Sequence, residues 1–409
     1  MCQASILFYW LLFYIVSERT QLTFSQRLIK LLAVAVGIIL GVGVVVGLEK
    51  WVGYITSLVL NVEGRGWSIV LPYFIPVFVF FLVILLHEGG HYVGSRLAGL
   101  RVYIFAVAWF RLERLGGGSR WRLRTDRRID KHWGYVVALP VDFDQLRRRQ
   151  AIFIGAGPLA NLLTGLPALL LGLYQVEQVP LERGTISEIF FSQFWLLLGV
   201  WSLLLCAINL LPYAANTDGA NLLQLWQNGP GWNRQLALLR LSSGSYQGTR
   251  PRLWDPVLLQ QLLVTEGDVA TDCTAYLFAY AHYLDSADME SAEEHISGAL
   301  KLVKNAYPSV RRHVYCEAAY FTAIHSERKD LPQQWFDLAE SIAPLRKDEG
   351  YFTRAVVAYS LEDYTTATHL LKLSLPLVEE SNDVGGRQQE ADRIHDLLDR
   401  INQRVTTAA

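Results

Sequence analysis

Four long apolar segments in the first 225 residues constrain the fold of this chain more than any other feature. An α-helix needs roughly 20 apolar residues to cross the hydrocarbon core of a bilayer, and each segment is close to that length. The segments are residues 29–48, 69–86, 151–174 and 189–211. A shorter aromatic-rich stretch, 4–16, is predicted to be a further span, with an interfacial segment as the alternative. The sequence therefore predicts a multi-pass membrane protein.

The chain after residue 225 has the composition of a charged, soluble protein. We therefore expect a mainly α fold class: a polytopic membrane helix bundle with a small β element, followed by a soluble α-helical domain. The formal net charge of −1 averages two unlike halves and predicts no nucleic-acid partner. The four cysteines form neither a CxxC pair nor an extracellular disulfide pattern.

Basic residues gather in one loop. Residues 101–150 hold twelve Lys and Arg against five Asp and Glu, and loops with such an excess stay in the cytoplasm under the positive-inside rule. Counting spans from this loop places everything after residue 211 in the cytoplasm. The predicted location is the cell membrane, with a cytoplasmic C-terminal domain.

The second apolar segment runs into the sequence His-Glu-Gly-Gly-His. His87 and His91 are four residues apart, so both imidazoles lie on one face of a helix and can bind one zinc ion. Glu88 lies close to such a metal and can take a proton from a zinc-bound water. A solvated, charged helix face is the alternative. However, these groups are costly at the end of an apolar span unless they line a cavity or bind a ligand.

Two later motifs offer further site residues. Asp218-Gly219 follows the last span, and Pro212 interrupts the helix, so a bent segment can return a carboxylate to the metal. A simple turn leaving the membrane is the alternative. Asn161 lies in the glycine-rich segment 155–165, whose glycines favour close helix packing. Asn161 then either joins two helices by a hydrogen bond or faces the metal and binds a substrate carbonyl.

Together the three motifs resemble the site-2 protease family of intramembrane zinc metalloproteases, peptidase family M50. The family pattern is HExxH, then GPxxN, then NxxPxxxxDG on successive membrane helices, and this chain has them in that order over roughly residues 68–225. The resemblance implies a Zn²⁺ site and a role for each motif residue: His87, His91 and Asp218 as metal ligands, Glu88 as the catalytic residue, and Asn161 and Asn209 as support for the substrate or the oxyanion.

Two features depart from the family pattern. The segment from Asn209 to Asp218 is one residue longer than the commonest form, and Thr217 stands where leucine is usual. We therefore expect the local geometry of the third ligand to differ, but not its identity. No stretch has the length and pattern of a PDZ domain, which many bacterial members carry.

The basic loop is predicted to contain three strands. Two are joined at glycines 116–118, and residues 133–142 form the third. In one interpretation this is a membrane-surface sheet whose arginines meet anionic lipid headgroups. In the other, a free strand edge also binds an extended substrate peptide, and family members have a membrane-reentrant β element beside the active site.

The domain boundaries follow from these features. We expect membrane segments in residues 1–67, the protease core in 68–225 with the basic β loop 101–150, a linker in 226–255 and a helical domain in 256–409.

Helical pairs recur in the last domain and weakly resemble tetratricopeptide-like hairpins. The pairs are residues 274–285 with 289–304, 309–327 with 332–343, and 351–361 with 364–377. They form either a concave protein-binding surface or a plain helical bundle. Residues 388–405 are predicted to form a polar amphipathic helix whose charges are solvated.

The sequence thus predicts an integral membrane zinc metalloendopeptidase. It hydrolyses peptide bonds of membrane-associated proteins by a zinc-bound water that Glu88 activates. Expected partners are the lipid bilayer, a membrane-protein substrate and a protein partner at the C-terminal domain. The alternative is a catalytically inactive scaffold relative that binds a partner through that domain. The intact Glu88 argues against it, because a scaffold does not need a general base.

Overall fold

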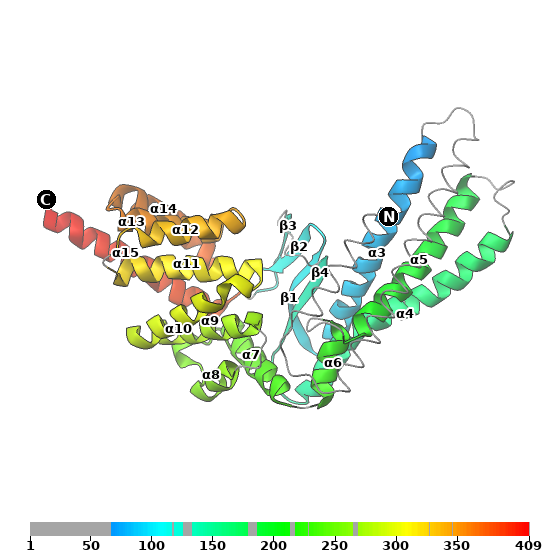
Figure 1. Cartoon of the computed structure of the whole chain (residues 1–409), viewed down its shortest axis with the longest axis horizontal. Helices are drawn as coiled ribbons and strands as arrows, with labels where there is room; N and C mark the ends of the chain where they lie inside the picture. Colours follow the sequence, from blue (N-terminus) through cyan, green and yellow to red (C-terminus); the bar gives the residue numbers. More distant parts are fainter. Residues whose placement is uncertain are drawn as a thin grey trace. The chain divides into compact units, whose positions relative to one another are not determined.

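The computed structural model describes most of the chain after residue 66 (Figure 1). The described residues are 67–116, 118–125, 133–178, 186–212, 217–227, 229–264, 269–326, 328–345 and 347–408. They contain thirteen α-helices and one small sheet, which confirms the mainly α fold with a small β element. The predicted spans 4–16 and 29–48 lie outside these residues.

Contacts divide the chain into two units. We call the first the membrane unit; its described residues are 67–99 and those of Arg147–Gln227. We call the second the sheet-and-helix unit; it combines Leu100–Leu146 with Asn228–Ala409. The basic β loop was predicted to belong to the protease core, whereas its contacts group it with the C-terminal helices.

Three helices of the membrane unit are long and apolar enough to cross a bilayer. They are α3 (Trp67–Leu97), α4 (Leu146–Gln178) and α5 (Ile186–Leu210), which coincide with three of the predicted spans. Val79 and Val83 of α3 pack with Leu197 and Leu198 of α5 in one buried cluster. A short helix, α6 (Asp218–Gln227), follows.

Helices α3 and α4 approach each other closely through small residues. A Cβ atom added at Gly90 or Gly94 would collide with Ala156 of α4, so only glycine permits this separation. Helix α3 ends at Leu97, and Gly99 two residues later has a φ of +66°, which favours glycine. The Arg149 guanidinium donates hydrogen bonds to the carbonyl oxygens of Ala98 (2.6 Å) and Gly99 (2.7 Å), which satisfies the end of the helix.

The sheet is antiparallel with strand order β3-β2-β1-β4. Its strands are β1 (Leu100–Val107), β2 (Phe110–Arg114), β3 (Trp121–Thr125) and β4 (Gly134–Pro140). The prediction of three strands was wrong, because the stretch before the glycines turns back on itself between β1 and β2. Ala108 makes this turn with a φ of +48°, and no Gly, Pro or Asn marks the position.

One face of the β2–β3 hairpin carries charged side chains, and the other carries exposed apolar ones. Glu113 is buried and forms ion pairs with three arginines, Arg111, Arg122 and Arg124. Arg122 also pairs with Glu380 at 2.6 Å. Arg122 thus joins the hairpin to the C-terminal helices, and contact of the loop's arginines with lipid headgroups stays a prediction. The opposite face exposes Phe110, Leu112, Trp121 and Leu123.

Helix α7 (Pro230–Tyr246) occupies much of the segment expected to be a linker. Pro230 stands at its first position, where proline favours helix initiation, and its buried Ala237 and Leu241 pack in a core with Trp254. Tyr246 stacks edge-on against Tyr103 of β1, and the Ser243 hydroxyl donates to the carbonyl oxygen of Pro140 at the end of β4. The helix thus packs on the sheet.

After the turn η1 (Pro251–Leu253) and α8 (Pro256–Leu263), three helical hairpins follow, as predicted. Their helices are α9 (Val269–Asp285) with α10 (Met289–Leu302), α11 (Pro308–His325) with α12 (Leu331–Ile342), and α13 (Lys347–Ser360) with α14 (Tyr364–Glu379). A short turn, η2 (Val303–Asn305), follows α10.

The first and third hairpins share one turn. Ala287 and Glu362 adopt φ of +60° and +64°, and the next residue, Asp288 or Asp363, caps the following helix. The two turns therefore share a backbone geometry. Their likeness to tetratricopeptide repeats stays a prediction.

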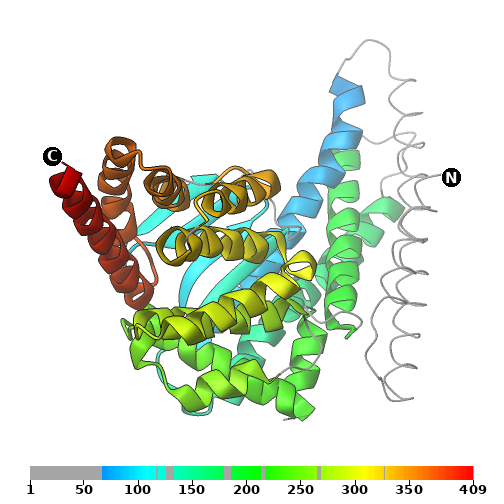
Figure 2. The ribbon, with the colours of Figure 1, turned by 60° about the vertical axis from the view of Figure 1, so that its left-hand side comes forward.

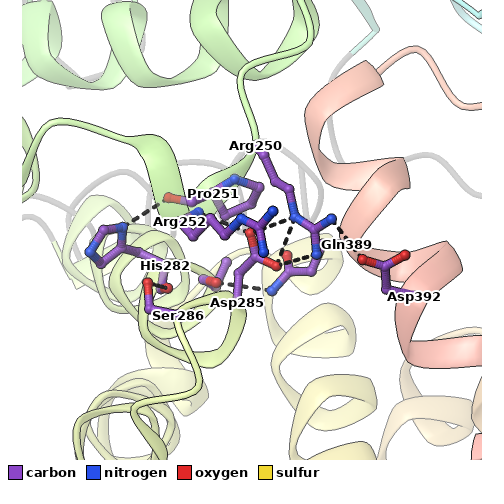
Figure 3. A network of polar contacts seen from close by, with 9 residues as sticks. Arg250, Pro251, Arg252, His282, Asp285, Ser286, Gln389 and Asp392 are labelled. Atoms are coloured by element: carbon purple, nitrogen blue, oxygen red, sulfur yellow. Dashed lines mark hydrogen bonds and ion pairs between the residues drawn. The ribbon is translucent and has the colours of Figure 1, made fainter. Parts of the chain in front are cut away.

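The last helix, α15 (Val384–Ala408), lies beside α14 and also contacts α7 (Figure 2). Arg250 binds both Asp285 of α9, with three hydrogen bonds of 2.7 to 3.0 Å, and Asp392 of α15 at 2.6 Å (Figure 3). One turn away from Asp392, the Gln389 amide donates to the carbonyl oxygen of Ala281 at 2.9 Å.

Arg393 of α15 is buried against Glu317 of α11, with hydrogen bonds of 2.9 and 3.2 Å. Its guanidinium also lies 3.7 Å from the ring centre of Tyr320. The prediction that the charges of this helix are only solvated was therefore wrong, since several of them fix α15 to the hairpins.

Candidate metal centre

Helix α3 brings two histidines together at the end of an apolar span. His87 and His91 are one turn apart and are both buried, and their Nε2 atoms are 3.2 Å apart. Burying two imidazoles in this apolar helix is costly unless each ring nitrogen has a partner.

Asp218, the first residue of α6, approaches the same point. Its Oδ2 atom lies 3.2 Å from His87 Nε2 and 3.5 Å from His91 Nε2. Thr217 fixes the start of α6: its hydroxyl oxygen accepts a hydrogen bond from the Ala220 N–H, and its hydroxyl donates to the Leu211 carbonyl. A Cβ atom on Gly219 would collide with the Leu210 carbonyl, so the Asp218-Gly219 pair permits this tight return to the helices.

The three side chains fit a metal ion. His91 Nδ1 lies 2.9 Å from the Phe153 carbonyl oxygen, which can only accept, so the proton of His91 is on Nδ1 and Nε2 carries a lone pair. This lone pair faces His87 Nε2 and Asp218 Oδ2, a buried atom without a hydrogen-bond donor. The ligand atoms of the three residues lie within 4.8 Å of one another. Two imidazoles and one carboxylate are a donor set suited to Zn²⁺ with an open fourth position.

Helix α4 contributes the surroundings of both histidines. The Asn161 side chain is fully buried, and its Nδ2 lies 3.2 Å from His87 Nδ1. One turn earlier, Gly157 lies against the His91 ring, which a Cβ atom there would penetrate. One turn earlier again is Phe153, whose carbonyl meets His91.

Two further residues were predicted to act here. Glu88 is buried on α3 between the two histidines in sequence and interacts electrostatically with His91 and Asp218. Asn209 lies at the end of α5, where its amide donates to the Leu205 carbonyl oxygen of its own helix at 3.1 Å. The structure thus gathers His87, His91, Asp218 and Asn161 by direct contact.

Three contributors were not predicted as part of the site: the Phe153 carbonyl, Gly157 and Thr217. The spacing of Gly157 and Asn161, four residues on one helix, repeats the spacing of His87 and His91. This repeat is visible in the sequence. The Phe153 carbonyl has no sequence signature, because any residue supplies a carbonyl.

Residues 75–230 match the family model of Peptidase family M50. This confirms the resemblance to the site-2 protease family. The match supports a protease, and the family implies a membrane zinc metallopeptidase. Together with the three apolar helices, it indicates association with a membrane. The comparisons with curated proteins and with solved structures found no match.

Proposed function

We propose that this protein is an integral membrane zinc endopeptidase that cleaves membrane-associated proteins. The observation that supports it most is the convergence of His87, His91 and Asp218 on one point, with Glu88 next to His87 on the helix of the two histidines. This arrangement lies inside the segment that matches Peptidase family M50.

In the proposed reaction, His87, His91 and Asp218 hold Zn²⁺. The ion, when bound, acts as a Lewis acid on the scissile carbonyl and makes water a stronger acid. Glu88 takes the proton of the attacking water and passes it to the leaving amide nitrogen as the peptide bond breaks. The apolar helices around these residues limit bulk water, so charges at the site act in a low dielectric.

The sheet-and-helix unit is proposed to serve recognition. In the described residues, β3 pairs only with β2, so its other edge suits an extended peptide that adds as a further strand. The aromatic and leucine side chains exposed beside it, among them Trp121 and Leu123, suit the interfacial region of the bilayer. The helical hairpins offer a surface for a protein partner.

The competing function is a scaffold that binds a partner without catalysis. The buried Glu88 disfavours it, because a buried carboxylate beside two histidines is costly and a scaffold gains nothing from a general base.

The test compares membranes of cells that produce the parent, Glu88→Gln or Glu177→Gln. Glu177 is exposed at the end of α4 and provides a matched control. New protein N-termini, identified by mass spectrometry, are expected with the parent and with Glu177→Gln. Glu88→Gln should lose at least the roughly 10²–10⁴-fold typical of a general base while it keeps its zinc. The scaffold function predicts the same N-termini in all three samples.

A further inference from the structure

In its present orientation, the Asn161 amide contacts His87 through its nitrogen and leaves its oxygen without a hydrogen-bond donor. Asn161 Nδ2 lies 3.2 Å from His87 Nδ1, while Asn161 Oδ1 is buried and has no hydrogen-bond donor. A buried acceptor without a donor is unfavourable, and this one belongs to a fully buried side chain.

Donation from the Asn161 amide to His87 Nδ1 would also put the proton of His87 in the wrong place. A neutral imidazole carries one proton, so Nδ1 as an acceptor would leave that proton on Nε2. His87 Nε2 faces Asp218 Oδ2 at 3.2 Å and His91 Nε2 at 3.2 Å, where a lone pair is needed to bind a cation.

Rotating the Asn161 amide by 180° gives its Oδ1 a hydrogen-bond donor and moves the proton of His87 off Nε2. The two amide atoms exchange places, and which atom faces His87 is decided by the hydrogen bonds that each can form. His87 Nδ1–H then donates to Oδ1, and His87 Nε2 is left with a lone pair. His91 already has this arrangement, because its Nδ1–H donates to the Phe153 carbonyl.

We infer that Asn161 is a positioning residue that accepts the Nδ1–H hydrogen bond of His87 and so presents its Nε2 to the metal. This inference rests on the proposed function and assigns Asn161 a different task from contact with the substrate or the oxyanion. In that task the amide N–H must donate; in the task inferred here the amide oxygen must accept.

The spacing of residues on α4 matches the spacing of the two histidines on α3. His87 and His91 are four residues apart on α3, and Asn161 and Gly157 are four apart on α4, running the opposite way. Asn161 meets His87, and Gly157 makes room for the ring of His91. Hydrogen bonds of this kind orient metal-binding histidines, and their loss typically weakens metal affinity about 10–100-fold.

The test measures zinc affinity of the purified full-length protein by competition with a chelator. Asn161→Asp keeps an acceptor and lacks a donor, Asn161→Leu lacks both, and Thr164→Ala is the control. The Thr164 hydroxyl donates to the Ala160 carbonyl within α4. We expect about 10–100-fold weaker zinc binding by Asn161→Leu, and affinity close to that of the parent for Asn161→Asp and Thr164→Ala.

Parent-like zinc affinity in Asn161→Leu would overturn the inference. An equal loss in Asn161→Leu and Asn161→Asp would also overturn it, because acceptance would then not be what matters. These outcomes differ from failure of the proposed function, in which the parent itself would not bind zinc. Rescue by Asn161→Asp separates positioning from a general loss of folding.

Discussion

Single residues at the candidate metal centre are constrained by the contact between α3 and α4. The two histidines need space and hydrogen-bond partners, and α4 supplies them through Phe153, Gly157 and Asn161. The glycine is the most sensitive of these, because the His91 ring fills the volume that a side chain would take.

We therefore predict that Gly157→Ala displaces His91 and lowers zinc occupancy and proteolysis together. Overpacking of this kind typically costs about 1–3 kcal/mol. Gly155→Ala is the matched control, since a Cβ atom there meets nothing within 4 Å. Zinc content of both purified variants measures the effect. Equal zinc content in the two variants would show that the His91 ring can move without loss of the site.

The sequence predicted which residues come together at this site, but it did not predict all of their contacts. Spacing alone placed His87 and His91 on one helix face. The Asp218-Gly219 pair after a break in the helix is a recognisable sign that the chain turns back and brings a carboxylate toward the metal. The partner of Asn161 could not be predicted, because an asparagine in a membrane helix can face a neighbouring helix, a metal or a substrate with similar ease.

At the scale of elements, α15 depends on a buried ion pair. Glu317 and Arg393 are bonded twice and are largely inaccessible. Removing one partner of such a pair leaves the other charge buried and typically costs about 3–5 kcal/mol.

We predict that Glu317→Gln lowers the unfolding temperature of the sheet-and-helix unit substantially. Asp396→Asn should have little effect, because its ion pair with Arg400 on the same helix is exposed, and exposed pairs contribute about 0–1 kcal/mol. Thermal unfolding of the full-length protein, followed by circular dichroism, compares them. Similar losses in both variants would contradict a special role for the buried pair.

The Glu317–Arg393 pair also predicts that the stability of the fold depends on pH. Burial alone would raise the pKa of Glu317, but the charges of Arg393 and His313 outweigh it and hold the pKa below its ordinary value. A carboxyl of this kind stabilises the fold above its ordinary pKa, and the contribution is lost as pH falls through the lower, folded-state pKa.

We therefore expect the difference in unfolding temperature between the parent and Glu317→Gln to be largest near neutral pH and to shrink on acidification. Melting curves over a pH series measure it. A difference that grows as the pH falls would have the wrong sign.

Elements were predicted unevenly. The helical hairpins were predicted because their apolar periodicity is clear and the turns are short. The β1–β2 turn was missed because Ala108 adopts a positive φ that alanine rarely adopts. Helix α7 was missed because glycines and a proline near its ends favoured a linker, although the proline in fact begins the helix.

At the scale of the whole molecule, we expect the sheet and the C-terminal helices to lie on one side of the membrane. Residues 100–146 pack with 228–409 in one unit, and two apolar helices, α4 and α5, separate them in sequence. Two membrane crossings would return the chain to the side from which it started. The packing of the two segments and the number of candidate spans between them therefore give the same topology. The sequence grouped the β loop with the membrane core because the two are adjacent, whereas ion pairs such as Arg122 with Glu380 join residues far apart in sequence.

The basic excess of residues 101–150 predicts that this side is the cytoplasm. In a form without its natural cysteines, Gly118→Cys and Thr406→Cys should both resist an impermeant thiol reagent in intact cells. Gln178→Cys, at the end of α4, should be labelled. All three positions are exposed, so burial does not explain protection. Labelling at position 118 or 406 in intact cells would reverse the proposed orientation.

The metal content of the purified protein decides whether this chain has a zinc site. We expect about one zinc per chain after purification or reconstitution, because His87, His91 and Asp218 form a three-ligand site. Asp218→Ala, measured in parallel by elemental mass spectrometry, should lose most of this zinc. A parent protein that binds no zinc would rule out the zinc site, and an Asp218→Ala variant with full occupancy would rule out Asp218 as its third ligand.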